Sequence, residues 1–168
     1  MCVSMAPAEF SGTILYGGRR QHPRYGPVEV LGYQNTAVNH ATGANAMVLH
    51  LPSPALGQEH FVPVGEHRDV LQRMVNALRP PPTAGAFAAV GVAPAVTVFE
   101  HDIYTVVLAS DPTQIPGALS RVPERKRPAL NPELFDFYAK VFPQHSIALC
   151  CFDNADAQQA SPLLIWYP

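Results

Sequence analysis

Residues 32–52, with the sequence GYQNTAVNHATGANAMVLHLP, hold most of the chain's unusual polar side chains beside runs typical of buried strands. Val28–Leu31 precedes this stretch and Ala46–Leu49 lies within it, and glycine, proline or asparagine bounds each run. Short apolar runs bounded in this way are typical of strands in a sheet. The pattern predicts two strands joined by a polar loop over residues 34–45.

This polar loop is the candidate binding site. Its side chains can donate or accept hydrogen bonds, and only a protonated His40 would carry a charge. Binding residues concentrate on loops held by rigid elements, although asparagine and threonine also serve purely as turn residues. We expect Asn45, next to the apolar run, to be structural and His40 to face a ligand. The candidate ligand-binding residues are Gln34, Asn35, Asn39, His40 and Asn45.

Composition favours a compact globular protein. The chain has 168 residues, of which 48% are hydrophobic and 14% charged, and its net charge is −2 at pH 7. That length can bury a core without disulfides or metals. A slightly acidic chain has no general attraction for phosphate backbones or anionic lipid. We therefore expect neither nucleic acid nor a membrane as a partner.

Targeting signals and disulfides are not expected either. The start MCVSMAPAEF has no basic segment followed by an apolar one, and the chain has no span of about 20 apolar residues, the length that crosses a bilayer. The three cysteines are an odd number, and two of them are adjacent. This usage fits a reducing compartment. The prediction is a soluble, cytoplasmic protein.

Two helices are well marked. Apolar residues at positions 70, 71, 74, 75 and 78 share one helical face. Asn131 as N-cap, Pro132 at the first helical position and Glu133 in the first turn predict a helix that ends before Pro143. A short helix is expected at 115–122. Residues 83–95, rich in alanine, glycine and proline, predict a mobile crossover.

The strands lead to a fold class. Either two strands flank a tight turn at His101–Asp102, or residues 96–109 form one bulged strand. No repeat and no second composition regime appear, so residues 1–168 are expected to form one domain. The prediction is an α+β fold with a largely antiparallel β-sheet covered by two or three helices. Other strands are expected at 10–16, 28–33, 46–51, 146–152 and 163–167.

Cys2 is the candidate catalytic residue. Removal of Met1 would leave a free α-amino group, with a pKa of about 8, that could act as base for the cysteine's own thiol. The chain resembles N-terminal-nucleophile amidohydrolases in its Met-Cys start, its β-rich opening and its available asparagines. The resemblance implies a cysteine hydrolase acting on an amide bond, with Asn35 or Asn45 holding the oxyanion.

Metal and nucleotide cofactors are not expected. The seven histidines show no HxH or HExxH spacing and the cysteines no CxxC spacing, and the adjacent Cys150 and Cys151 on a strand would point to opposite faces. His101–Asp102 could orient a cysteine nucleophile, but such a pair also suits a turn. No glycine-rich phosphate-binding motif is present. The prediction is therefore no metal and no cofactor.

Three functions fit these features. The first is a small-molecule or peptide binding domain with its site at residues 34–45, and the second is the cysteine-dependent amide hydrolase. The third is a subunit-interaction module that uses exposed aromatics and proline-rich connections. The sequence leaves the oligomeric state open.

Overall fold

The computed structural model describes residues 2–78, 96–154 and 158–168. The predicted crossover at 83–95 lies outside these residues. The strands are β1 (Cys2–Ser4), β2 (Ala8–His22), β3 (Gly26–Asn39), β4 (Asn45–Leu51), β5 (Phe61–Val62), β6 (Val96–His101), β7 (Tyr104–Ala109), β8 (Ser146–Phe152), β9 (Gln158–Gln159) and β10 (Leu163–Tyr167). The helices are α1 (Val70–Ala77), α2 (Ile115–Ala118) and α3 (Pro132–Val141). Short 3-10 turns lie at Gln58–His60, Pro112–Gln114, Leu119–Arg121 and Glu124–Lys126.

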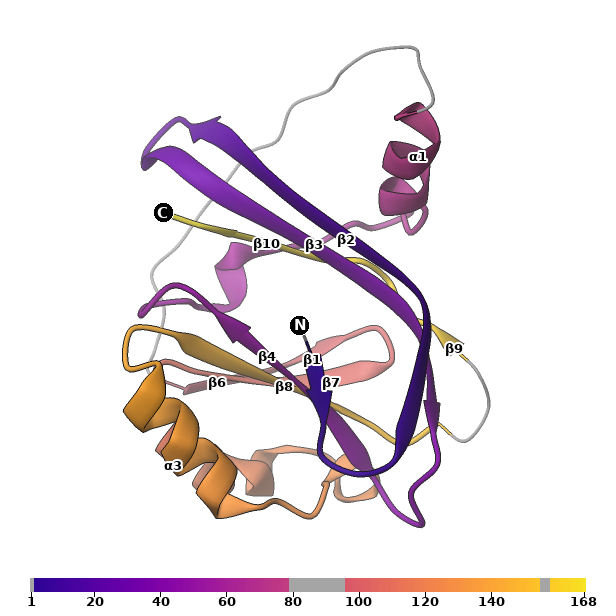
Figure 1. Ribbon diagram of the computed structural model, residues 1–168, viewed down its shortest axis with the longest axis vertical. Helices are drawn as coiled ribbons and strands as arrows, with labels where there is room; N and C mark the ends of the chain where they lie inside the picture. Colours follow the sequence, from indigo (N-terminus) through magenta and orange to yellow (C-terminus); the bar gives the residue numbers. More distant parts are fainter. Residues whose placement is uncertain (1, 79–95, 155–157) are drawn as a thin grey trace.

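The strands divide into two antiparallel sheets that face each other (Figure 1). Sheet A has the strand order β1-β4-β8-β7-β6, and sheet B has the order β2-β3-β10-β5, with β9 paired to β3. The α+β fold with antiparallel strands and helical cover is confirmed. The sequence predicted one sheet, but two form, because β10 pairs with β3 and β8 pairs with β4. These strands are far apart in the sequence, so local patterns do not reveal their pairing.

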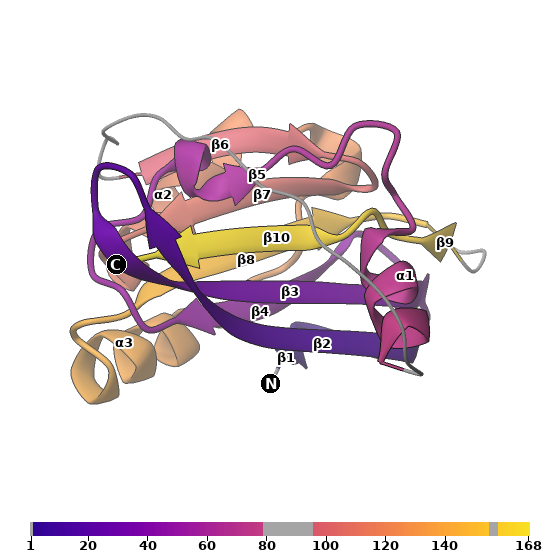
Figure 2. The same ribbon diagram turned by 90° about the horizontal axis from the view of Figure 1, so that it is seen from above.

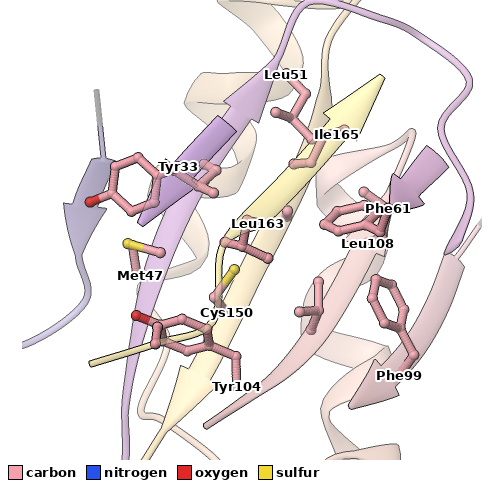
Figure 3. Packing of buried hydrophobic residues seen from close by; sticks show 14 of the residues in the cluster. Tyr33, Met47, Leu51, Phe61, Phe99, Tyr104, Leu108, Cys150, Leu163 and Ile165 are labelled. Carbon is pink, nitrogen blue, oxygen red and sulfur yellow. The ribbon is translucent and has the colours of Figure 1, made fainter. Parts of the chain in front are cut away.

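Side chains from both sheets fill the space between them (Figure 3). Tyr33, Met47, Tyr104, Cys150 and Ile165 are among the buried members of this first core. A second core lies between the outer face of sheet A and the helices α2 and α3. Successive residues of β8 alternate between the two cores, since Cys150 belongs to the first and Cys151 to the second. Both faces of β8 are therefore buried, as its continuous apolar run predicted.

Helix α1 packs on the outer face of sheet B, beside β2 and β3 (Figure 2). A Cβ built on Gly32 would come within 2.8 Å of Cδ2 of Leu71 and 3.1 Å of Cβ of Tyr16. Glycine at this position therefore lets the helix approach the sheet closely. The predicted amphipathic helix at 70–78 is present, and Leu71 is its fully buried residue.

Helix α3 begins as its sequence predicts. Asn131 precedes the first helical residue, and its Oδ1 accepts a hydrogen bond from the backbone N–H of Glu133 at 3.1 Å. Phe135 and Tyr138 bury one face of α3 in the second core. The cap residue, the proline at the first helical position and the spacing of apolar residues all indicate the same helix. The local sequence was therefore sufficient to predict where α3 begins.

The segment 96–109 forms two strands joined by a tight turn. His101 pairs with Tyr104, and Asp102 adopts a left-handed conformation with φ of 56°. Asp102 Oδ2 accepts hydrogen bonds from Nη2 of Arg68 and from the backbone N–H of Ser161, both at 2.7 Å. The turn therefore connects sheet A to the segments that enter α1 and β10.

Candidate functional site

The polar connection between β3 and β4 is shorter than the sequence predicted. Residues 34–39 continue β3, and only residues 40–44 join it to β4. The strand continues because β2 pairs with Thr36–Asn39 and β9 pairs with Thr36 and Ala37. Neither partner could be recognised from the polar composition of residues 34–39. In a strand, alternate side chains point to opposite faces, so the candidate residues are divided between two environments.

Gln34 lies on the outer face of sheet B. Its side chain is 3% exposed, and Nε2 donates to the carbonyl oxygens of Arg68 at 3.2 Å and Ala160 at 2.9 Å. Its Oε1 is buried and has no hydrogen-bond partner among the described residues. Gln34 therefore ties β3 to the segments that lead into α1 and β10.

Asn35 points into the core between the sheets and is 1% exposed. Its Oδ1 accepts a hydrogen bond from the Tyr104 hydroxyl at 2.9 Å, and its Nδ2 donates to the Tyr33 hydroxyl at 3.2 Å. These contacts connect β3 of sheet B with β7 of sheet A. Asn35 is thus a polar bridge inside an apolar core, where each buried polar group requires a partner.

Asn45 holds the segment between β1 and β2, and Asn39 is hydrogen-bonded to Asn45. Asn45 is fully buried; its Oδ1 accepts from the backbone N–H of Ala6 at 3.0 Å, and its Nδ2 donates to the carbonyl oxygens of Ala6 and Pro7. Nδ2 also donates to Oδ1 of Asn39 at 3.2 Å, while Nδ2 of Asn39 donates to the carbonyl of Gly43. Both amides therefore have intramolecular partners.

His40 is the one candidate whose side chain is exposed, at 53% of its surface. Its Nε2 lies 3.7 Å from Oε2 of Glu9. Glu9 lies on β2, opposite Val38. The exposed member of the predicted set is thus located beside β2.

The proposed catalytic constellation is divided along β4. The backbone of Cys2 pairs with Leu49, whereas Asn45 lies opposite Phe152 at the other end of the strand. The amides of Asn35 and Asn45, the predicted oxyanion donors, form the interior hydrogen bonds described above. Burial raises the pKa of the Cys151 thiol to about 12, which makes its thiolate inaccessible at neutral pH.

The free edge of β2 is the feature that sequence reasoning missed. β2 has 15 residues and, within the described part of the chain, forms a ladder with β3 alone. The pairing shifts between Ser11 and Ile14, where β2 contains one extra residue and Gly12 has a φ of +57°. Beyond this bulge, Ile14–His22 pairs in regular register with β3. Figure 2 shows β2 at the edge of its sheet.

The register assigns each side chain of this edge to a face. Leu15 pairs with Tyr33, a residue of the core between the sheets, so Leu15, Gly17 and Arg19 point towards sheet A. Tyr16 pairs with Gly32 beneath α1, so Tyr16, Gly18 and Arg20 lie on the outer face. Leu15 is 64% exposed although its face is the core face, because β2 is the last strand.

An aromatic cluster closes the hairpin end of β2. His22 stacks on Trp166 with ring centroids 4.8 Å apart, and Tyr25 and His60 contact the same indole at 5.2 Å and 4.5 Å. The Trp166 Nε1–H donates to the carbonyl oxygen of Glu59 at 3.3 Å. Burial lowers the pKa of His60. These contacts hold the end of the hairpin against β10.

Two further surveys cover the described residues only. In residues 2–78, 96–154 and 158–168, no helix is both long and apolar enough to cross a membrane. In the same ranges, no group of three or more histidine, cysteine or acidic side chains is arranged to hold a metal ion.

Comparison with known protein families and with curated proteins found no match. Among solved structures, the chain is similar to the crystal structure of baculovirus P35, with 14% sequence identity and a TM-score of 0.47. The alignment covers 99% of this chain and 57% of that chain, so the protein spans less than two thirds of the viral protein's length. A similarity at this level carries no functional assignment.

Proposed function

We propose that this protein is a cytoplasmic, non-catalytic binding domain that receives an extended polypeptide segment along the edge of β2. The observation that carries the proposal is the free edge itself: β2 has 15 residues and pairs on one side alone within the described part of the chain. An edge strand presents a row of N–H and C=O groups to solvent, and an extended peptide satisfies them by adding a strand.

The exposed side chains along β2 support a peptide in preference to a compact small molecule. Leu15 offers apolar surface in the regular part of the edge, and Glu9 with His40 lies before the bulge. An extended strand advances about 3.3 Å per residue, so a single bound segment can follow Ile14–His22 along its length. His40 lies beside Glu9 on the other side of the bulge, so it contacts only a segment that extends past Gly12.

The interior polar contacts support the same preference. Gln34, Asn35, Asn39 and Asn45 are buried, and each has an intramolecular hydrogen-bond partner. A small polar ligand at residues 34–45 would have to replace these contacts, and replacing buried hydrogen bonds carries a free-energy cost. An added strand at β2 leaves them intact.

Amide hydrogen exchange with terminally blocked peptides tests the proposal. The probes are peptides of alternating threonine and valine with the length of Ile14–His22. We expect them to slow exchange at solvent-facing amides of β2, because these amides gain carbonyl partners. Strand β6 is a matched control, since it is one of the two edge strands of sheet A, with β1 at the other edge. Protection at β6 alone, or unchanged exchange at β2, would contradict the proposal.

A further inference from the structure

We infer that the segment received at β2 is acidic; this inference rests on the proposed function. The regular part of the edge, Ile14–His22, contains Arg19 and Arg20 and no carboxylate. Arg24 follows in the turn of the hairpin, where its guanidinium lies 5.4 Å from the centroid of the Tyr25 ring. The charge along this half of the edge is therefore positive although the whole chain has a net charge of −2.

The arginines differ in whether a carboxylate of this chain already pairs with them. Arg19 forms an ion pair with Glu29 of the neighbouring strand, and its Nε lies 2.8 Å from Oε1 of that carboxylate. Arg20 donates to the carbonyl oxygen of Arg19 at 3.3 Å, and no ion pair joins it to a carboxylate of the described residues. Arg20 and Arg24 are both exposed. Among the three arginines of the β2–β3 hairpin, these two have no ion pair with a carboxylate of the described residues.

The register indicates where the partner's acidic side chains belong. Arg20 lies on the outer face of sheet B, so a residue opposite it on an added strand also points outward. Cross-strand pairs of opposite charge are favourable and like charges are unfavourable. An acidic residue opposite Arg20, with another towards the hairpin turn and Arg24, complements this end. A residue near Leu15 meets apolar surface instead.

A second copy of β2 fits this edge less well. Pairing two copies of Ile14–His22 would bring two arginine-bearing strands together without a carboxylate between them. The bulge at Gly12 also interrupts the ladder before Glu9, so the acidic end of one copy cannot join a continuous pairing with the basic end of the other. Charge and register therefore both favour a different, acidic segment.

Binding of charged probe peptides tests this inference. Three blocked peptides of alternating threonine and valine carry two glutamates, two lysines or no charge at threonine positions. Trp166 is the only tryptophan and stacks on His22 at the end of β2, so its fluorescence reports binding. We expect the acidic peptide to bind about three- to tenfold more tightly than the neutral one at low salt, because exposed ion pairs contribute modestly. Added salt should reduce the difference.

Matched arginine variants identify the source of any preference. Arg20→Gln and Arg24→Gln should each reduce the preference for the acidic peptide, and the double variant should abolish it. Arg125→Gln is the control, because Arg125 is an exposed arginine paired with Asp153 beside sheet A. An acidic preference that survives the double variant, or equal affinity for the acidic and basic peptides, would overturn the inference while the proposed function stands.

The remaining outcomes separate the two proposals. If none of the three peptides binds, the proposed function is wrong and the inference fails with it. A deoxythymidine oligonucleotide that displaces the acidic peptide without protecting β2 amides would identify a general anion site instead. A dimer in light scattering that excludes every peptide would show that β2 pairs with a second copy.

Discussion

Buried amide side chains join parts of this protein that are distant in the sequence. Asn35 connects β3 to β7 through the Tyr104 hydroxyl, and Asn45 holds the backbone of Ala6 and Pro7. An amide can donate and accept at once, so it can satisfy several groups inside a core. Removing one leaves its former partners to find others in an environment without free water. These residues should therefore contribute to stability.

Alanine variants separate the interior amides from the exposed histidine. Asn35→Ala and Asn45→Ala should each lower the free energy of unfolding by about 1–3 kcal/mol, because buried hydrogen bonds are lost. At this chain length, each kcal/mol lowers Tm by about 2–4 °C. His40→Ala should change stability by less than about 0.5 kcal/mol, since its side chain is mostly exposed. Thermal melts of the three variants measure the difference.

A double-mutant cycle provides the control for Asn35. Tyr104→Phe removes the hydroxyl that donates to Asn35 Oδ1. If the two groups interact as the geometry indicates, the combined variant should lose less stability than the sum of the single variants. Additive losses would contradict the bridge between the two sheets. Equal losses for His40→Ala and Asn45→Ala would contradict the assignment of His40 to the surface.

Among the described α-helices, α3 is the one whose N-cap side chain accepts a hydrogen bond from the first turn. Asn131→Ala removes the acceptor for the Glu133 backbone N–H and should cost about 1 kcal/mol in urea unfolding. Asn131→Asp is the matched control, because a carboxylate can accept the same hydrogen bond and suits a helix N-terminus. Equal stability of the alanine and aspartate variants would mean that the cap contributes nothing.

At the scale of the whole molecule, histidines contribute to the pH dependence of stability. Burial lowers the pKa of His50, His60 and His101 below their ordinary value of 6.5, and His145 lowers that of His50 further. Below pH 6.5 the unfolded chain therefore binds more protons than the folded one, and the free energy of unfolding falls. Above that pH these histidines are neutral in both states and add no dependence.

Urea unfolding from about pH 8 to about pH 5 measures this dependence. We expect a plateau at the alkaline end and a decline as the pH falls below the ordinary histidine pKa. His101→Gln should flatten part of the decline, because burial lowers the pKa of His101 and a glutamine takes up no proton in this range. Stability that rises on acidification through this range would contradict the direction of all three shifts.

Local sequence was sufficient wherever one segment contains its own signal. The Asn131–Pro132–Glu133 start of α3, the helical spacing of α1 and the double-sided apolar run of β8 each depend on neighbours along the chain. Periodicity and capping also identified the α+β class, because they report which faces of an element must be buried. For the predicted polar set, the sequence recognised the residue types but not their surroundings.

Tertiary structure alone decided which strand is an edge and which polar residues are interior. Within the described residues, β3 pairs with β2 on one side and with β9 and β10 on the other, whereas β2 pairs with β3 alone. Gln34 and Asn35 lie in a strand because the end of β3 pairs with β2 and β9. Asn35 can lie in the core because Tyr104 of β7 donates a hydrogen bond to it. Pairing between distant strands depends on the whole chain, so no local stretch of sequence contains it.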